Sequence, residues 1–343
     1  MRMQLSLWKT LFLSIVLSII VIPIESRAEE KPRVIIMTDG EVDDRSSMVH
    51  LLLCSNEVDI LGIIQANSFS QPKGHSVDGW LEKQMEHYAV VYPNLKAHAD
   101  GYPDPAILKS RCFLGDEDES HIVVQGNGMN RFPGDEVKID PVLWDETPGS
   151  KAIVETLLDE NPAKVYLLAW GGGNTAAKAF QILKDKHSAA DYHRAVSKAV
   201  MYNIWYQDGA GNYIETYHPG VTMLLSYGFL DTWAYGALAY SEDFVTNHLK
   251  RDNPLMQDYV NDYINEGDSP SFFHMLGNGL RSYEEPLGVA GVAVSIKLRG
   301  RKTCGVTLTR CLTPHGQKKC FATLRQETCG ALLQTMTKQT TIL

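Results

Sequence analysis

Four carboxylates within six residues are the strongest chemical signal in this sequence. Asp39, Glu41, Asp43 and Asp44 follow the apolar run of residues 33–38. Neighbouring carboxylates repel one another unless protons or a cation intervene, and calcium binds roughly six to eight oxygen ligands of this kind. The alternative is helix capping, in which Asp43 or Asp44 caps a following helix and the other acids are solvated. Capping needs only a single acid, so the cluster favours a cation site.

Short buried strands that alternate with helices would position this cluster. Continuous apolar runs predict strands over residues 33–38, 59–66, 165–170, 199–204 and 221–227. Helical spacing predicts helices over residues 46–54, 77–91 and 175–183. This alternation predicts an α/β fold with a mostly parallel open sheet and helices on both faces. Ligands of such sheets bind at the carboxyl ends of the strands, so chemistry is expected in the loops that follow them.

Two of those loops carry further polar groups. Residues 171–175 read Gly-Gly-Gly-Asn-Thr and lack both the GxGxxG spacing and the lysine of a phosphate-binding loop. They predict a turn that lets the backbone approach a ligand or a metal. Gln207 and Asp208 follow the 199–204 strand and could bind sugar hydroxyls, although the same segment also reads as a plain turn rich in Gly and Asn.

Other ionisable residues carry weaker signals. His218 and His274 are candidate acids for a leaving group because histidine titrates near neutrality, but the sequence shows no partner for either. The acidic run at residues 116–119 is most simply a solvated loop.

The acidic cluster resembles the nucleoside hydrolase signature Asp-x-Asp-x-x-x-Asp-Asp, which also follows a first strand. The chain resembles in particular the nucleoside hydrolase-like domain of bacterial secreted proteins, some of which are labelled cellulose-binding. The matching segments are TDGEVDD at 38–44, SNEVDILGII at 55–64, GHSVDGWLE at 74–82, PNLKAHADGYP at 93–103, AWGGGNT at 169–175 and EGDSPSF at 266–272. The resemblance covers residues 32–286 and implies the nucleoside hydrolase fold, a Rossmann-like open sheet.

The resemblance also implies a calcium site and a hydrolytic reaction. Asp39 would bind calcium and act as the base for an attacking water, and Asp44 would bind the same ion. Asn174 would contribute its backbone carbonyl, and Asp268 would be the calcium ligand on the far side. A calcium-bound water has a lowered pKa, so a neighbouring carboxylate can take its proton. The water would then attack an anomeric carbon with oxocarbenium-like character.

The implied sugar site departs from the family pattern at two positions. Asp43 and Asn67 match residues that bind sugar hydroxyls. The first Asp of the signature is Met37 here, so a carboxylate that orients the loop is lost. The His that nucleoside hydrolases often place before the far-side Asp is Gly267. A purine nucleoside is therefore a poor fit, and another glycoside or carbohydrate is expected. The rival interpretation is a carbohydrate-binding protein that kept the pocket but lost turnover.

Composition excludes several classes of protein. The chain has 343 residues, of which 44% are apolar and 21% charged, as in a globular protein rather than a disordered chain or a fibre. The net charge of −9 argues against a nucleic-acid surface. The expected partner is a small-molecule glycoside or a carbohydrate, and the sequence leaves open whether the protein forms a homo-oligomer.

Residues 1–28 predict a secretory signal peptide. Arg2 and Lys9 precede an apolar run from Leu11 to Ile24, and Ala28 ends a segment typical of a cleavage site. The alternative is a retained membrane anchor, but the apolar run is shorter than the roughly 20 residues that a spanning helix needs. The mature protein is therefore expected to be periplasmic or secreted and to have no membrane segment after cleavage.

Residues 287–343 differ in kind from residues 29–286, the predicted nucleoside hydrolase-like domain. They contain nine basic residues against one acid, neither Trp nor Tyr, and four of the six cysteines. The cysteines are spaced too far apart for a zinc ribbon. The codons of residues 288–294 have degenerate third bases, and in another frame the same DNA can encode the Gly/Trp-rich continuation usual in the family. Our hypothesis is that a frameshift near Pro286 produced this basic, Cys-containing tail.

Overall fold

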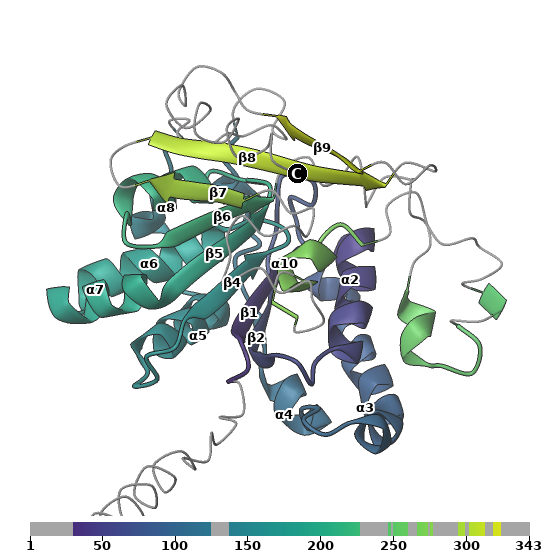
Figure 1. The fold of residues 1–343 in the computed structure, drawn as a ribbon. Coiled ribbons are helices and arrows are strands. Elements are labelled where there is room, and N and C mark those ends of the chain that lie inside the picture. Colours follow the sequence, from purple (N-terminus) through teal and green to yellow (C-terminus); the bar gives the residue numbers. More distant parts are fainter. Residues whose placement is uncertain are drawn as a thin grey trace, which may run out of the picture. The chain divides into compact units, whose positions relative to one another are not determined.

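Six parallel strands form the central sheet, in the order β3-β2-β1-β4-β5-β6 (Figure 1). The strands are β1 (Arg33–Thr38), β2 (Asp59–Gln65), β3 (Cys112–Leu114), β4 (Val165–Ala169), β5 (Ala199–Ile204) and β6 (Thr222–Ser226). The strand order reverses between β1 and β4, which makes the gap between their carboxyl ends the place where a ligand of such a sheet binds. The predicted α/β fold with a parallel sheet is confirmed.

The computed structural model describes residues 30–124, 137–226, 246–247, 250–259, 266–273 and 275–276, and the backbone of three further strands. The chain divides into two compact units, Met1–Lys31 and Pro32–Leu343, and all elements named below belong to the second. The predicted signal peptide lies outside the described residues. Within the described part of the chain, no helix has the length and apolar character needed to cross a membrane.

Buried apolar runs explain the strands. Every residue of β1 and of β4 is buried, as expected for central strands of a parallel sheet that is covered on both faces. The bounds of β1 and β5 agree with the predicted strands, and those of β2, β4 and β6 are slightly shorter. The sequence did not predict β3, because it has only three residues and lies at the sheet edge with partial exposure.

Helices cover both faces of the sheet. One face carries α2 (Val42–Leu53), α3 (Trp80–His98), α4 (Pro105–Ser110) and α10 (Ser269–Phe273). The other carries α5 (Pro148–Leu158), α6 (Asn174–Lys186), α7 (Ala189–Lys198) and α8 (Ala210–Tyr217). Short 3-10 turns are η1 (Ser76–Asp78), η2 (Glu119–His121), η3 (Pro141–Leu143) and η6 (Leu255–Asp258). The predicted helices are confirmed with shifted ends: α2 begins before residue 46, and α3 begins at Trp80 rather than residue 77 and continues through Pro93 to His98.

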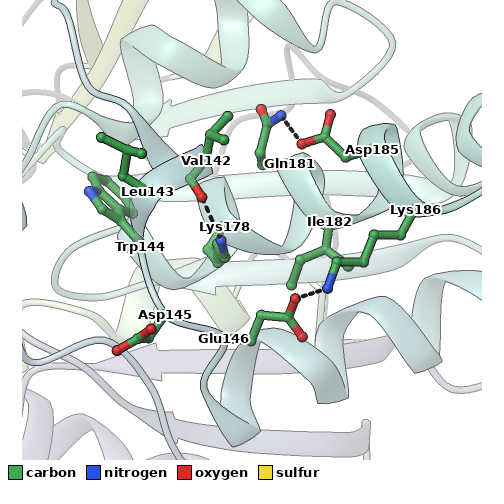
Figure 2. A pocket seen from close by; sticks show the side chains of 10 residues that line it. All are labelled: Val142, Leu143, Trp144, Asp145, Glu146, Lys178, Gln181, Ile182, Asp185 and Lys186. Atoms are coloured by element: carbon green, nitrogen blue, oxygen red, sulfur yellow. Dashed lines mark hydrogen bonds and ion pairs between the residues drawn. The ribbon is translucent and has the colours of Figure 1, made fainter.

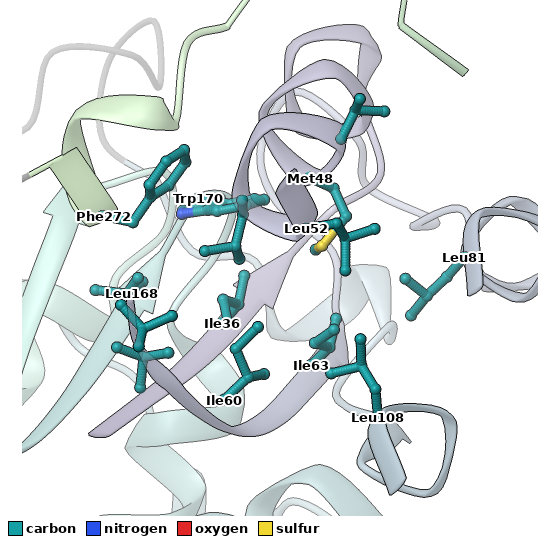
Figure 3. Close-up of a cluster of buried hydrophobic side chains, with 14 of the residues drawn as sticks. Ile36, Met48, Leu52, Ile60, Ile63, Leu81, Leu108, Leu168, Trp170 and Phe272 are labelled. Atoms are coloured by element: carbon teal, nitrogen blue, oxygen red, sulfur yellow. The ribbon is translucent and has the colours of Figure 1, made fainter. Parts of the chain in front are cut away.

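Alternate side chains of each strand enter two separate cores. Ile36 and Leu168 pack with Met48 and Leu52 of α2 and with Phe272 of α10 (Figure 3). The second core, on the opposite face, contains residues of β1 and β4 together with those of α5 and α6. The first core fixes α2 and α10 against the same face of the sheet, which matters because both elements border the acidic cluster.

A separate antiparallel sheet lies in the predicted tail. It contains β7 (Val294–Leu298), β8 (Lys302–Leu312) and β9 (Lys318–Thr323), with β8 in the centre. The remainder of residues 287–343 lies outside the described residues.

Candidate functional site

The loops after β1 and β4 meet at the carboxyl edge of the sheet. A Cβ atom on Gly171 would lie 2.7 Å from the Cβ of Asp39, so the glycine allows close approach of the two loops. The neighbouring Gly172 donates its N–H to the carbonyl of Asn67, at 3.0 Å, and thereby joins the loop after β2. The loops after β1, β2 and β4, in which chemistry was expected, therefore lie together in the structure.

Thr38 orients the acidic loop. Its hydroxyl donates to Asp44 Oδ1 at 2.5 Å and accepts the N–H of Gly40 at 3.2 Å. The N–H of Asp39 donates to the same oxygen of Asp44, at 3.1 Å. Met37, which stands where the signature has its first Asp, is fully buried in the apolar core with α6. The loop is thus held by a hydroxyl and backbone groups rather than by the missing carboxylate.

Helix capping does not explain the acids. The N-cap of α2 is Glu41, and its side chain makes no capping hydrogen bond. Asp43 and Asp44 instead lie in the first turn, where the helix dipole favours negative charge. For an exposed acid, the interaction with the helix dipole is stabilising by about 0.3–1 kcal/mol. It is small beside the cost of burying several carboxylates together.

Asp43, Asp44 and Asp268 form a potential metal site. One carboxylate oxygen from each lies within 4.8 Å of the others. Asp43, which was predicted to bind sugar hydroxyls, belongs to this group, whereas the predicted calcium ligand Asp39 does not. Asp44 and Asp268 are 2% and 1% exposed. Asp268 comes from the segment before α10, and its predicted role as a calcium ligand stays a prediction.

Two carboxylate oxygens at this edge lack a hydrogen-bond partner. Asp39 Oδ2 and Asp268 Oδ2 are both buried and unpaired within the described part of the chain. A buried acceptor without a donor is costly, and a carboxylate more so than a neutral group. An all-oxygen donor set of this kind fits calcium, which prefers carboxylate and carbonyl ligands.

The pKa values of these acids respond to burial and to one another. Burial, followed by the charges of Asp39 and Asp43, raises the pKa of Asp44 well above its usual range. Burial and the neighbouring carboxylates do the same to the pKa of Asp268. Burial and the charges of Glu41 and Asp39 raise the pKa of Asp43 to about 7. The cluster therefore resists full ionisation at neutral pH in the absence of a cation.

Asn67 and Asn174 add two further unpaired acceptors. Asn67 donates its side-chain N–H to the carbonyl of Pro72 at 2.9 Å, and Asn174 donates to that of His121 at 3.0 Å. In both residues Oδ1 is buried and has no partner among the described residues. Asn174 is the first residue of α6, directly after the glycine turn. Both predicted residues thus lie buried at the carboxyl edge.

Asp208 and Gln207 hold the loops together. One oxygen of Asp208 accepts the N–H groups of Gly173 at 2.6 Å and Asn174 at 3.0 Å, and the other accepts that of Ala210 at 2.8 Å. Gln207 donates to the carbonyls of Trp170 and Ile204. The structure therefore gives both residues a scaffolding contact, and their predicted binding of sugar hydroxyls stays a prediction.

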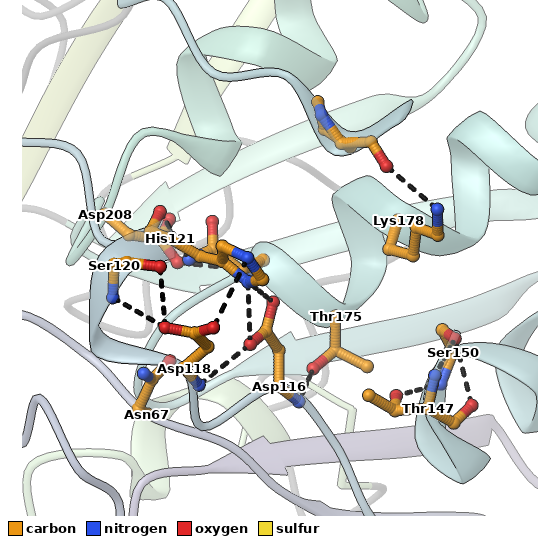
Figure 4. A network of polar contacts seen from close by, with 12 residues as sticks. Asn67, Asp116, Asp118, Ser120, His121, Thr147, Ser150, Thr175, Lys178 and Asp208 are labelled. Carbon is orange, nitrogen blue, oxygen red and sulfur yellow. Dashed lines mark hydrogen bonds and ion pairs between the residues drawn. The ribbon is translucent and has the colours of Figure 1, made fainter. Parts of the chain in front are cut away.

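The interpretation of residues 116–119 as a solvated loop was wrong for Asp116. Asp116 is 6% exposed, and its carboxylate lies 2.9 Å from His121 Nδ1 (Figure 4). The His121 ring stacks on Trp144, with ring centroids 4.5 Å apart. The backbone carbonyl of His121 also accepts the hydrogen bond from Asn174. Only the proximity of a His to several acids signalled this pair in the sequence.

The candidate leaving-group acids receive little support. His218 is fully buried, its Nδ1 lies 3.0 Å from the hydroxyl of Tyr192, and burial lowers its pKa to about 4. It packs near Phe180 in the second core and is a structural residue. His274 lies outside the described residues. At Gly267 a Cβ atom would lie 2.0 Å from Asp43 Oδ2, so a side chain where the related His would stand requires the Asp43 carboxylate to move.

A separate surface pocket lies between η3 and α6 (Figure 2). Its volume is about 620 Å³, and it contains none of the predicted site residues. Lys178 donates to the carbonyl of Pro141 at 2.9 Å, and Lys186 forms an ion pair with Glu146. Because both lysines already have partners, this pocket is a weaker candidate for a binding site than the carboxyl edge, where buried oxygens lack partners among the described residues.

Known proteins match the chain over most of the described sheet. Residues 33–290 match the family described as "Cellulose-binding Sde182, nucleoside hydrolase-like domain". A solved structure from Saccharophagus degradans, described as a nucleoside hydrolase-related hypothetical protein associated with carbohydrate metabolism, is 27% identical with a TM-score of 0.59. The match covers 73% of this chain and 56% of that one, so the chain spans just over half the length of that protein. No curated protein matches.

Proposed function

Because the chain belongs to the family of cellulose-binding, nucleoside hydrolase-like domains, we propose that it is a calcium-dependent hydrolase of a glycosidic bond in a carbohydrate or glycoside. The observation that carries the proposal is the buried, unpaired oxygen of Asp39 next to the three-carboxylate cluster. A protein that needed these acids only for folding would pair them with donors. Unpaired acids at a ligand-binding edge are better explained by a cation and a substrate.

Asp44 and Asp268 would hold the metal, with Asp39 and the backbone carbonyl of Asn174 beside it. Calcium supplies positive charge that lowers the pKa of a water and neutralises the acids. Among the residues that the structure describes, Asp39 Oδ2 has no hydrogen-bond partner, so it could accept a proton from a water. The other oxygen, Oδ1, accepts the N–H of Glu41 at 3.1 Å, which fixes the carboxylate in place.

Asp43 and Asn67 would bind sugar hydroxyls. Asn67 Oδ1 has no partner within the described ranges, and a hydroxyl donor would satisfy it. Asp43 lies at the start of α2 and contacts Gly267. Nearby carboxylates stabilise positive charge that develops at an anomeric carbon, as glycoside hydrolysis requires. The bond that is cleaved could be N-glycosidic. A purine leaving group is disfavoured, because Gly267 stands where nucleoside hydrolases often place a His.

The second candidate is a carbohydrate-binding protein without turnover. The family description is cellulose-binding, and this chain lacks both the first signature Asp, at Met37, and a side chain at Gly267. Such a protein would use the same acceptors for sugar hydroxyls. It would not need Asp39 as a base.

The variant Asp39→Asn separates the two candidates. For a hydrolase we expect turnover of a responsive glycoside to fall by about 100-fold or more, because the base is removed. For a binder, carbohydrate affinity should persist in the variant and wild type should show no turnover. Asp258→Asn, a change at a largely buried acid of η6 outside the three-carboxylate cluster, is the matched control. Loss of activity in both variants would point to general damage.

We further propose that the protein is exported and that residues 1–28 are removed. The support is the leader pattern and a family description that implies a polysaccharide ligand outside the cell. N-terminal sequencing of the protein recovered from cells tests the cleavage. A mature chain that starts at Met1 would contradict it.

A further inference from the structure

Glu266 is the centre of a buried polar network beside the acidic cluster. It is 4% exposed, yet both of its carboxylate oxygens are engaged. Oε1 accepts the hydroxyl of Tyr259 at 2.8 Å. Oε2 contacts His50 Nδ1 at 2.8 Å and accepts the hydroxyl of Ser269 at 2.8 Å. Fully engaged carboxylates of this kind rigidify the segment that carries them.

The segment 266–268 lies along one stripe of α2. Gly267 packs against Asp43, the N–H of Asp268 donates to Ser47 Oγ at 3.2 Å, and Glu266 contacts His50. Positions 43, 47 and 50 are spaced by four and three residues, so they share one helix face. The three residues thus lie against different turns of the same helix, and Glu266 and Asp268 are bonded to it.

His50 is itself held in place. Its ring meets Phe272 and Phe273 of α10 edge-on, with ring centroids 5.7 Å and 4.9 Å away. Phe272 belongs to the first apolar core. The contact between His50 and Glu266 is therefore anchored to the core rather than to mobile surface groups.

We propose that Glu266 and His50 are a positioning pair that holds Asp268 at the metal site. The need for such a pair follows from charge. Asp268, Asp43 and Asp44 place carboxylate oxygens within 4.8 Å of one another, so their repulsion would push the far-side ligand away. The pair fixes the residues on either side of Asp268 and so preorganises the ligand before the metal arrives. This inference rests on the proposed calcium site.

The matched control is a second buried pair of the same chemistry. Asp258 of η6 lies 2.6 Å from His87 Nδ1, and its side chain is 9% exposed, against 6% for Glu266. Asp258 is outside the three-carboxylate cluster. Asp258 also lies 3.8 Å from Lys83 Nζ and precedes Tyr259, which donates to Glu266. Glu266→Gln and Asp258→Asn therefore each remove a largely buried charge paired with a His, but only the first removes contacts to the segment that carries Asp268.

The test combines calcium titration with amide hydrogen exchange on the full chain. We expect Glu266→Gln to weaken calcium binding about 10-fold or more, the effect typical of groups that support metal ligands. Without calcium, residues 266–273 should exchange faster in this variant. His50→Gln should act in the same direction. Asp258→Asn should leave both quantities within about twofold of wild type.

Two results would overturn the inference. One is Glu266→Gln with wild-type calcium affinity and unchanged exchange. The other is an equal loss of affinity in Asp258→Asn, which would indicate general loosening. If wild type binds no calcium, the proposed function fails, and the exchange experiment in metal-free protein still decides whether the pair holds Asp268 in place.

Discussion

A carboxylate oxygen of Asp44 lies within 4.8 Å of one from Asp268, although the two residues come from α2 and from the segment before α10. Both side chains are almost fully buried. Two such groups repel strongly when ionised, so the contact destabilises a metal-free protein. A cation bound among these carboxylates would explain the arrangement. The same acids would then lower the stability of the metal-free protein and provide the metal site.

Asp268→Asn should separate those two effects. The amide keeps the shape of the side chain and removes one buried like charge, so we expect the metal-free variant to unfold with a free energy about 1 kcal/mol higher than wild type. It should also lose stabilisation by added calcium, because a ligand is gone. Urea unfolding with and without calcium measures both. A variant less stable than wild type without metal would contradict the account of repulsion.

Met37→Asp should not restore a better site. Met37 is fully buried in the second apolar core, so a carboxylate there would lack donors, and we expect a loss of about 3 kcal/mol or more. Met37→Leu conserves volume and should cost less than about 1.5 kcal/mol. Chemical unfolding of both variants is the measurement. Wild-type stability of Met37→Asp would show that the loop rearranges to accept the signature residue.

Gly267→Ala should damage the site through Asp43. The added Cβ would lie 2.0 Å from Asp43 Oδ2, so one of the two must move. We expect weaker binding of calcium and of carbohydrate, by about 10-fold. Gly62→Ala is the control, since its nearest neighbour would be an ordinary 3.4 Å away. Titration with calcium and with carbohydrate measures both variants. Equal losses of affinity in the two variants would contradict a special role of Gly267.

His218 should make stability depend on pH. Burial lowers its pKa to about 4, whereas an unfolded His titrates near 6.5, so the unfolded chain binds more protons between these values. The contribution of His218 is thus complete above about pH 6.5 and is lost as the pH falls towards 4. It amounts to about 3 kcal/mol. His218→Gln should flatten this part of the profile in urea unfolding. A parallel profile in the variant would assign the dependence to other groups.

The tail hypothesis is tested at the level of the gene. The family match ends at residue 290, close to the proposed frameshift near Pro286. We expect resequencing to show an inserted or deleted base there, with the Gly/Trp-rich continuation in the restored frame. An intact original frame would contradict this, and the strands β7, β8 and β9 would then belong to the natural product.

Local signals account for what the sequence could predict. Asp43 and Asp44 were recognisable because four acids follow a strand whose apolar run is unmistakable. The contacts that position Asp268 were not recognisable from the sequence. They join segments far apart in the chain, and such contacts leave no local sequence pattern. The burial of Asp116 against His121, only five residues away, escaped for a different reason, since an acidic run is normally solvated.

Calcium titration by calorimetry, after exhaustive chelation, tests the central claim most directly. We expect tight one-to-one binding that vanishes in Asp44→Ala, because Asp44 is buried and one of its oxygens lies within 4.8 Å of those of Asp43 and Asp268. No binding at millimolar calcium, or binding that survives Asp44→Ala, would contradict the proposed metal site and leave carbohydrate binding without turnover as the better account.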